Sequence, residues 1–251
     1  MTQAPPKQVW DAAWFKSARQ STRELWRAVE AQHRVATMRL VDNLEEQRLL
    51  EDLLEASKPP LPPGSKGLHF LLHTPFRYLS PQATRFRRAN APGIWYGAHG
   101  VPTVCAELAY WRWRFVTDSD GLRATVLITE HTLFAAQFKG HALDLTRAPW
   151  VAQRDTWRDP QDYAPCQRLA DEVRAANALR TSNASTSAIA AIRYESARRE
   201  GGICMAVLEP ASLTVPEPHR QQTWVCKASK DAVMLTHDRE GASFSATYWQ
   251  K

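Results

Sequence analysis

The sequence lacks any apolar run approaching the ~18 residues that a membrane-spanning helix needs. Its first residues, Met1 to Lys7, lack the basic and apolar regions of a secretory signal peptide. Both absences predict a cytoplasmic protein that binds no membrane. With 44% hydrophobic and 23% charged residues, the composition is typical of a folded globular protein.

Metal-binding and disulfide patterns are also missing. The four cysteines, Cys105, Cys166, Cys204 and Cys226, form no C-x-x-C pair, so we expect reduced and mostly buried thiols. The histidines show no close metal-ligand spacing; His73, His99, His131 and His141 each stand alone. The sequence therefore predicts no metal site.

No Walker loop, G-x-G-x-x-G, G-x-S-x-G or H-E-x-x-H motif is present, which argues against a dehydrogenase with a Gly-rich nucleotide turn. The net charge is +6, and residues 1–60 hold nine basic and nine acidic side chains, so the surplus follows residue 60. A basic main domain indicates an anionic partner: a nucleic acid, a phosphate-bearing small molecule or an acidic protein.

The first quarter of the chain has helical periodicity. Residues 9–57 are predicted to be helical, with capping-box spacing at Ser21 to Glu24 and a second helix starting near Asp42 to Glu45. The proline-rich run at 58–63 then ends any helix. We therefore divide the chain into an N-terminal helical extension with its linker, residues 1–63, and a main domain, residues 64–251.

The main domain mixes strands and helices without regular βαβ alternation, which predicts the α+β class. The best strand candidates are 67–72, 93–98, 122–129, 188–194 and 203–208, with further short strands around 224–226 and 244–246. Helices are predicted at 102–115, with proline in the first turn, and at about 164–179.

Arginines, an aromatic strand end and a carboxylate follow one another between residues 73 and 115. Four arginines, Arg77, Arg85, Arg87 and Arg88, fall within twelve residues, and Tyr96 and Glu107 follow. Each feature alone has an ordinary explanation: a solvated loop, strand packing, or a carboxylate stabilised by a helix dipole. Together they predict a pocket for an anionic ligand that contains a ring.

The order of these residues resembles the RES domain family, named for its Arg, Glu and Ser. Arg85 precedes Phe, Tyr96 lies in Gly-x-x-Tyr-Gly-Ala, and Glu107 follows Ala. The serine would be Ser196, in Tyr-x-Ser-Ala-Arg; Ser182, Ser185 and Ser187 are rivals, but none follows a predicted strand and precedes Ala-Arg. The resemblance covers about residues 67–212, and the segment 45–59 is similar to an extension on a longer branch of the family.

The resemblance implies an ADP-ribosyltransferase-like fold: a mixed β core with flanking helices, here preceded by the N-terminal helical extension. It implies a toxin that degrades NAD⁺ by hydrolysis or phosphorolysis, with NAD⁺ as substrate and no further cofactor. It also implies a partner antitoxin with a Xre-like domain. The toxin would contact nucleic acid only indirectly, through this antitoxin.

The residue types suit this chemistry. Arg85, with Arg77 as a second donor, would hold the pyrophosphate, because guanidinium binds phosphate oxygens strongly. Tyr96 would stack on or bound the nicotinamide ring. Glu107 would stabilise an oxocarbenium-like transition state, and Ser196 would position the ribose or the amide.

Other functions stay open. The same site would suit a protein mono-ADP-ribosyltransferase. A basic nucleic-acid-binding protein or RNase toxin draws support from the sequence pI of about 9.3 and from Trp111 to Arg114, and a non-catalytic interaction protein could use the helical extension for assembly. The acceptor of ADP-ribose, the identity of the antitoxin, a homo-oligomeric state and the choice among the four arginines also stay open.

Overall fold

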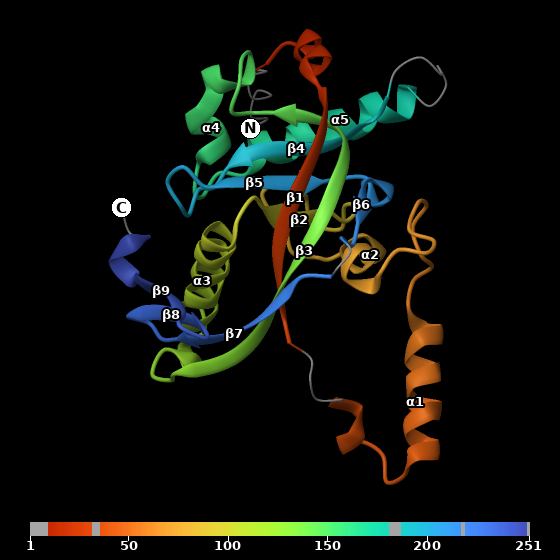
Figure 1. The fold of residues 1–251 in the computed structure, drawn as a ribbon, viewed down its shortest axis with the longest axis vertical. Helices are drawn as coiled ribbons and strands as arrows, with labels where there is room; N and C mark the ends of the chain where they lie inside the picture. Colours follow the sequence, from red (N-terminus) through yellow and green to blue (C-terminus); the bar gives the residue numbers. More distant parts are fainter. Residues whose placement is uncertain (1–9, 32–35, 181–186, 217–218, 250–251) are drawn as a thin grey trace, which may run out of the picture.

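The structure, a computed structural model, describes residues 10–31, 36–180, 187–216 and 219–249. A long, strongly curved sheet forms its centre, with helices around it (Figure 1). The α-helices are α1 (Leu44–Ser57), α2 (Phe70–Arg77), α3 (Val101–Thr117), α4 (Arg154–Arg158) and α5 (Ala164–Arg180). The strands are β1 (Arg19–Glu30), β2 (Trp95–Ala98), β3 (Leu127–Asp144), β4 (Ile189–Glu195), β5 (Ile203–Val207), β6 (Leu213–Thr214), β7 (Gln221–Ala228), β8 (Ala232–His237) and β9 (Glu240–Ser245). The 3-10 helices are η1 (Ala12–Ser17), η2 (Ala36–Arg39), η3 (Asp120–Leu122), η4 (Trp150–Gln153), η5 (Pro210–Ser212) and η6 (Ala246–Tyr248).

The strand order is β1-β2-β5-β4-β3-β7-β8-β9, with β6 beside β3. Because β1 also pairs with β3, the strands β1, β2, β5, β4 and β3 close into a ring of pairings. The link between β1 and β2 is slight, at Trp26 opposite Ala98, whereas β1 pairs with β3 along its whole length. The β3–β4 pair is parallel, and the mixed sheet with flanking helices confirms the predicted α+β class.

The helical prediction for residues 9–57 is wrong between residues 19 and 30. This segment forms β1, which runs antiparallel to residues 131–142 of β3 (Figure 1). The apparent capping box at Ser21 and Glu24 therefore lies within a strand. Pairing with a distant segment overrides local helix propensity here, and Leu25 is fully buried as a result. The predicted N-terminal extension thus contributes a strand to the central sheet.

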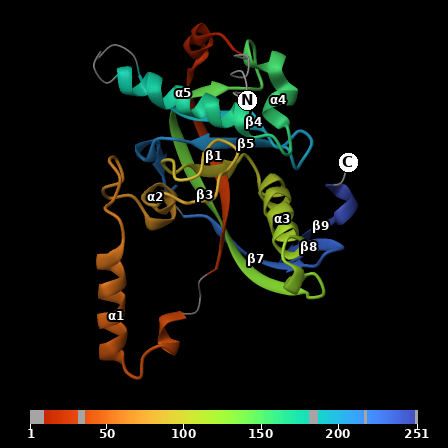
Figure 2. The same ribbon diagram turned by 180° about the vertical axis from the view of Figure 1, so that it is seen from behind.

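The second helix of the extension is confirmed as α1. Asn43 caps it, because its side-chain oxygen accepts hydrogen bonds from the backbone N–H groups of Glu45 and Glu46. The helix ends at Ser57, before the prolines. In both ribbon views α1 stands away from the sheet (Figures 1 and 2).

Five of the other predicted elements are confirmed, whereas the strand predicted at residues 122–129 overlaps only the first three residues of β3. Helices α3 and α5 and strands β2, β4 and β5 lie where the sequence placed them. The strand predicted at residues 67–72 is wrong, because α2 begins at Phe70. Leu72 and Phe76 are four residues apart and both buried, so their spacing fits a helix that packs on the sheet, and the His69 side chain caps its first turn.

All four cysteines are buried and free, which confirms the predicted burial. In the part of the chain that the structure describes, no helix is long and apolar enough to cross a membrane.

Candidate active site

A pocket with a cavity volume of about 300 Å³ lies between α3, the strands β1 and β2, and the loops that follow α2 and β4. Gly97 lies in its wall, and a Cβ there would come within 2.4 Å of the Trp95 ring, so the close approach requires glycine. Aromatic and apolar side chains predominate in the lining, with one carboxylate and three arginines among them. The lining residues are Trp26, Arg27, Ala28, Thr84, Arg85, Tyr96, Gly97, Ala98, Val104, Glu107, Leu108, Trp111, Tyr163, Tyr194, Arg198 and Cys204.

Glu107 and Ser196 meet at this pocket. Glu107 is on the second turn of α3, a helix that begins with Pro102 in its first turn. The Ser196 hydroxyl donates a hydrogen bond to Glu107 Oε1 at 2.5 Å and accepts bonds from the backbone N–H groups of Arg198 and Arg199. Ser196 is fully buried, so this contact fixes the carboxylate against a rigid turn.

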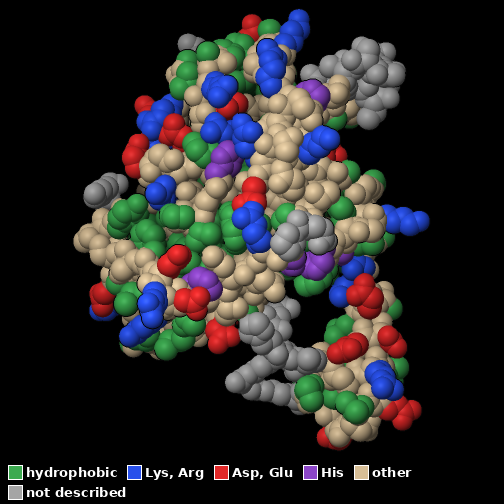
Figure 3. All heavy atoms as spheres, in the orientation of Figure 1, with side chains coloured by type: hydrophobic (Ala, Val, Ile, Leu, Met, Phe, Trp, Pro, Cys, Tyr) green, Lys and Arg blue, Asp and Glu red, His purple; other side chains and the backbone are tan. Residues whose placement is uncertain are grey.

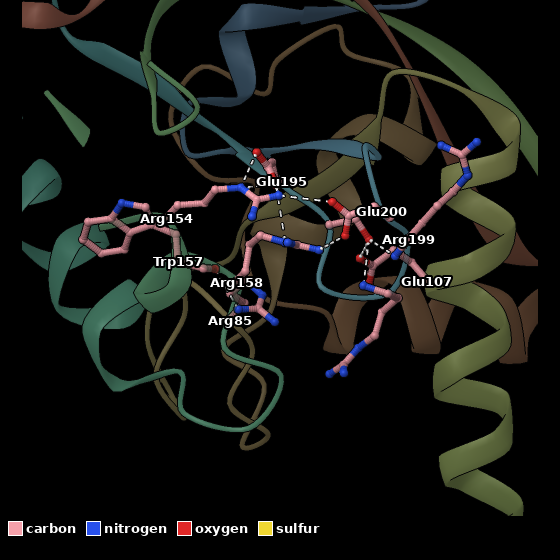
Figure 4. Close-up of polar contacts among 10 residues, drawn as sticks. Arg85, Glu107, Arg154, Trp157, Arg158, Glu195, Arg199 and Glu200 are labelled. Carbon is pink, nitrogen blue, oxygen red and sulfur yellow. Dashed lines mark hydrogen bonds and ion pairs between the residues drawn. The ribbon is translucent and has the colours of Figure 1, made fainter. Parts of the chain in front are cut away.

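An ion-pair network supports the turn that carries Ser196. Arg154 and Arg158 of α4 face Glu195 and Glu200 at the two sides of the turn (Figure 4). Arg154 lies 2.6 Å from Glu195 and 3.3 Å from Glu200; the corresponding distances for Arg158 are 3.4 and 2.7 Å. Four charges of alternating sign therefore tie α4 to the turn, which is a stronger arrangement than an isolated surface pair.

Arg85 is nearly buried and held by backbone carbonyls. Its Nη1 donates to Trp157 O at 3.0 Å and to Asp159 O at 2.8 Å. Its guanidinium also lies over the Tyr163 ring, 4.6 Å from the centroid. Arg85 reaches the pocket as predicted. Its hydrogen bonds also join the loop after α2 to the end of α4 and the segment that follows.

Tyr96 lines the pocket with its ring and ties down the Arg85 loop with its hydroxyl. The hydroxyl lies 2.8 Å from Thr84 Oγ1 and accepts a bond from the Phe86 N–H at 3.0 Å. Burial raises the pKa of the Tyr96 phenol to about 12, so it is neutral at physiological pH. Thr84 and Phe86 flank Arg85, so Tyr96 sets the position of the arginine loop.

Arg198 is a site residue that the sequence analysis did not single out, although it ends the Tyr-x-Ser-Ala-Arg motif. It is almost fully buried, and its guanidinium carbon lies 3.4 Å from the centroid of the Tyr110 ring. Its Nη2 donates to Pro160 O and to the Tyr163 hydroxyl. Arg85 thus lies over the Tyr163 ring, and Arg198 donates to the Tyr163 hydroxyl.

Arg27 is the second residue that the sequence analysis missed, because the helical prediction for this segment gave no reason to place it at a site. It lies on β1, and its Nη1 donates to Tyr96 O at 2.9 Å. Its Nε has no hydrogen-bond partner within the described residues. Burial lowers the pKa of the Arg27 guanidinium to about 10, so it still carries its charge at neutral pH.

The other predicted arginines lie outside the pocket lining. Arg77 donates to Pro59 O at 2.6 Å and to Glu55 at 3.0 Å, so the structure does not bring this predicted second donor to the site. Arg87 donates to the carbonyls of the loop that precedes it, and Arg88 pairs with Asp171 at 2.6 Å. Of the four clustered arginines, Arg85 is the one that reaches the pocket.

The rival serines are not at the pocket. Ser182 and Ser185 lie outside the described residues, and Ser187 precedes β4 and is absent from the lining. Cys204 does line it, with Sγ 3.9 Å from Glu107 Oε1. Burial, followed by the charge of Glu107, raises the pKa of the Cys204 thiol well above its usual value, so it is a neutral neighbour of the carboxylate.

The aromatic and basic run at residues 111–114 is engaged within the molecule. Arg112 pairs with Glu30 of β1, Arg114 pairs with Asp118, and the Trp113 indole donates to Lys230 O. Trp111 is half exposed at the pocket. Among the described residues, no group of three His, Cys, Asp or Glu side chains could hold a metal ion.

The fold and the pocket define a mixed α+β protein in which one half-buried carboxylate and three arginines line the same cavity. The RES domain profile matches residues 62–228, well over half of the sequence. The chain therefore belongs to the RES family, which confirms the resemblance drawn from the motifs.

No curated protein matches the chain significantly. A chain of the crystal structure of the M. tuberculosis MbcT–MbcA toxin–antitoxin complex is similar, at 10% sequence identity and a TM-score of 0.45, with 96% of each chain covered.

Proposed function

We propose that this protein is the toxin of a toxin–antitoxin pair and cleaves NAD⁺ at the nicotinamide–ribose bond. The observation that carries the proposal is the Ser196–Glu107 hydrogen bond of 2.5 Å at a pocket lined by Arg27, Arg85 and Arg198. Membership of the RES family supports both the reaction and an antitoxin partner of the Xre-like type.

The reaction breaks the bond between C1′ of the ribose and the nicotinamide nitrogen, and nicotinamide leaves with the bonding electrons. Positive charge then develops on the ribose, as in glycoside cleavage. The Glu107 carboxylate, held by Ser196, would stabilise that charge without having to reorganise. Water, phosphate or a protein side chain would add to C1′, and its proton would be released or accepted by Glu107.

The pocket lining suits the nicotinamide ring and the diphosphate of NAD⁺. A cavity of about 300 Å³ is at the small end for a ligand site, so it would hold one end of the dinucleotide and leave the other outside. The Tyr96 ring would bound the flat nicotinamide. The diphosphate would bind an arginine, and Arg27 has an unpartnered N–H with which to do so.

The test is NAD⁺ consumption by the purified protein, with nicotinamide release measured in buffers with and without phosphate. Glu107→Ala should abolish release, whereas Asp118→Ala at the end of the same helix should retain it. Dependence on phosphate would identify phosphorolysis. Wild-type protein, freed of any bound partner, that releases no nicotinamide would refute NAD⁺ degradation, and labelling of a protein substrate would then identify a transferase.

A further inference from the structure

Trp111 is the one exposed tryptophan of the chain. All ten tryptophans lie within the described residues; the other nine are buried or half-buried, whereas the exposed fraction of Trp111 is 51%. Trp111 nevertheless lines the pocket, one turn of α3 after Glu107, because residues four apart on a helix share one face. Its ring meets that of Tyr110 at an interplanar angle of 77°, so Tyr110 does not stack on it. The exposed part of the pocket therefore offers a large aromatic surface to a ligand.

The size of the cavity favours Trp111 as a contact for the adenosine half of NAD⁺. A volume of about 300 Å³ holds one end of the dinucleotide. When the ribose of the reacting bond lies at Glu107, the other end must leave the cavity along its exposed lining. Helix α3 rises only about 6 Å between Glu107 and Trp111, so a dinucleotide that spans the pocket passes this indole.

Strand β1 runs from the Tyr96 side of the pocket towards Trp111. At one point Arg27 Nη1 donates to Tyr96 O at 2.9 Å, while Arg27 Nε has no hydrogen-bond partner within the described residues. Three residues further along the strand, Glu30 forms an ion pair with Arg112, the residue next to Trp111. A diphosphate bound at Arg27 would therefore have the Tyr96 ring on one side and Trp111 on the other, which is the order of the parts of NAD⁺.

The charges around Trp111 do not favour a longer nucleic acid as its ligand, although bases of a single strand also stack on tryptophan. Arg112 and Arg114 already have carboxylate partners, Glu30 and Asp118. On the face that Figure 3 shows, the Lys and Arg side chains of the described residues lie in small groups with Asp and Glu between them. A phosphate backbone needs a continuous basic track, whereas a small nucleotide needs one arginine beside the ring.

We propose that Trp111 stacks on the adenine of NAD⁺, so that the pocket selects a purine dinucleotide over a nicotinamide mononucleotide. This inference rests on the proposed function, because it takes NAD⁺ as the substrate. The adenine is remote from the bond that breaks, so stacking on Trp111 contributes equally to binding of the substrate and of the transition state. Loss of the indole should therefore raise KM and leave kcat unchanged.

The first experiment measures nicotinamide release from NAD⁺ and from nicotinamide mononucleotide, which has the same reacting bond but lacks the AMP unit. Trp111→Ala should raise KM for NAD⁺ by about 5–100-fold and leave kcat/KM for the mononucleotide unchanged. Trp111→Phe keeps a ring and should have an intermediate KM. Phe115→Ala removes a similarly exposed ring of α3 that is absent from the pocket lining, so this control should match the wild type with both substrates. An unchanged KM for NAD⁺, or an equal change for both substrates, would overturn the proposal.

Calorimetric titration with ADP separates this inference from the reaction, because ADP carries the adenine and the diphosphate but needs no turnover. Trp111→Ala should bind ADP about 5–100-fold more weakly than the wild type or Phe115→Ala, and inorganic pyrophosphate equally well. Both side chains are exposed, so circular dichroism spectra should be unchanged. A protein that releases no nicotinamide yet needs Trp111 to bind ADP would refute the reaction and keep the adenine site. A wild type that does not bind ADP, or a Trp111→Ala protein that binds it normally and loses only a partner protein, would refute the adenine site.

Discussion

The two walls of the pocket hold their charges in opposite ways. On one wall Glu107 accepts a short hydrogen bond from Ser196, and the turn that carries Ser196 is itself tied to α4 by ion pairs. On the other wall Arg27 is a half-buried cation whose Nε has no hydrogen-bond partner among the described residues. The first wall is organised before a ligand arrives, whereas the second leaves a charge that a ligand would compensate.

Glu107→Gln tests the organised wall and should have the largest effect. The amide keeps the size and can still bond Ser196, but it removes the negative charge, so nicotinamide release should fall by about 10²–10³-fold. Steady-state kinetics should show the loss in kcat, while Asp118→Asn on the same helix keeps wild-type rates. A Glu107→Gln protein with normal kcat would mean that the carboxylate charge takes no part in the reaction.

Arg85→Met distinguishes a structural arginine from a ligand-binding one. It removes the two hydrogen bonds to the carbonyls of Trp157 and Asp159, so the free energy of unfolding should fall by about 1.5–3 kcal/mol. Urea denaturation measures this change. Unchanged stability would show that the hydrogen bonds of Arg85 to the two carbonyls contribute little. Arg88→Met, which breaks an exposed ion pair with Asp171, is the matched control and should lower the free energy of unfolding far less.

Ser196→Ala probes how the organised wall is held. The substitution leaves the N–H groups of Arg198 and Arg199 without their acceptor and frees the Glu107 carboxylate, so stability should fall by about 1–3 kcal/mol. The activity loss should be smaller than that of Glu107→Gln. Ser212→Ala, which removes one hydroxyl bond to Glu209 O, serves as the control in the same denaturation series.

The prediction for Arg27→Met is the reverse of that for Arg85→Met. Removing this half-buried cation loses one hydrogen bond to Tyr96 O but also removes the cost of desolvating the charge, so stability should change little. KM for NAD⁺ should rise by about 10–100-fold through loss of a charge-assisted bond. Arg23→Met, on an exposed position of the same strand, should change neither quantity, and an unstable Arg27→Met protein would contradict the comparison.

Tyr96→Phe should have the smallest effect. The ring that bounds the pocket stays, while the hydroxyl bonds to Thr84 and to the Phe86 N–H are lost, so we expect a loss of about 0.5–1.5 kcal/mol in stability. Tyr248→Phe, at a half-exposed position, is the matched control. A large loss of activity with unchanged stability would instead assign the hydroxyl to the reaction.

The sequence could predict Glu107 and Ser196 on the first wall of the pocket, but not Arg27 on the second. Helix α3 and Glu107 were predictable because Pro102 and the apolar spacing are local signals. Ser196 was found through a motif beside a predicted strand. Strand β1 and Arg27 were missed because their environment comes from β3, more than a hundred residues later, and local periodicity carries no information about that pairing.

Arg77 shows a different limit. Like Arg85, it stands next to an aromatic residue in one arginine-rich stretch. Arg85 reaches the pocket, whereas Arg77 binds Glu55 of α1 and the carbonyl of Pro59. The sequence predicts the composition of the site, whereas the partner of each arginine depends on the packing of helices far apart in the chain.

The pairing of β1 with β3 has a consequence for protein synthesis. Domains fold as the ribosome releases them, N-terminal parts first. Strand β1 leaves the ribosome early, but it must wait for residues 131–142 before its ladder can close, and Ser196 emerges later still. A nascent chain that lacks these segments carries Arg27 and Glu107 without a complete pocket to hold them, so the site cannot form before Ser196 has left the ribosome.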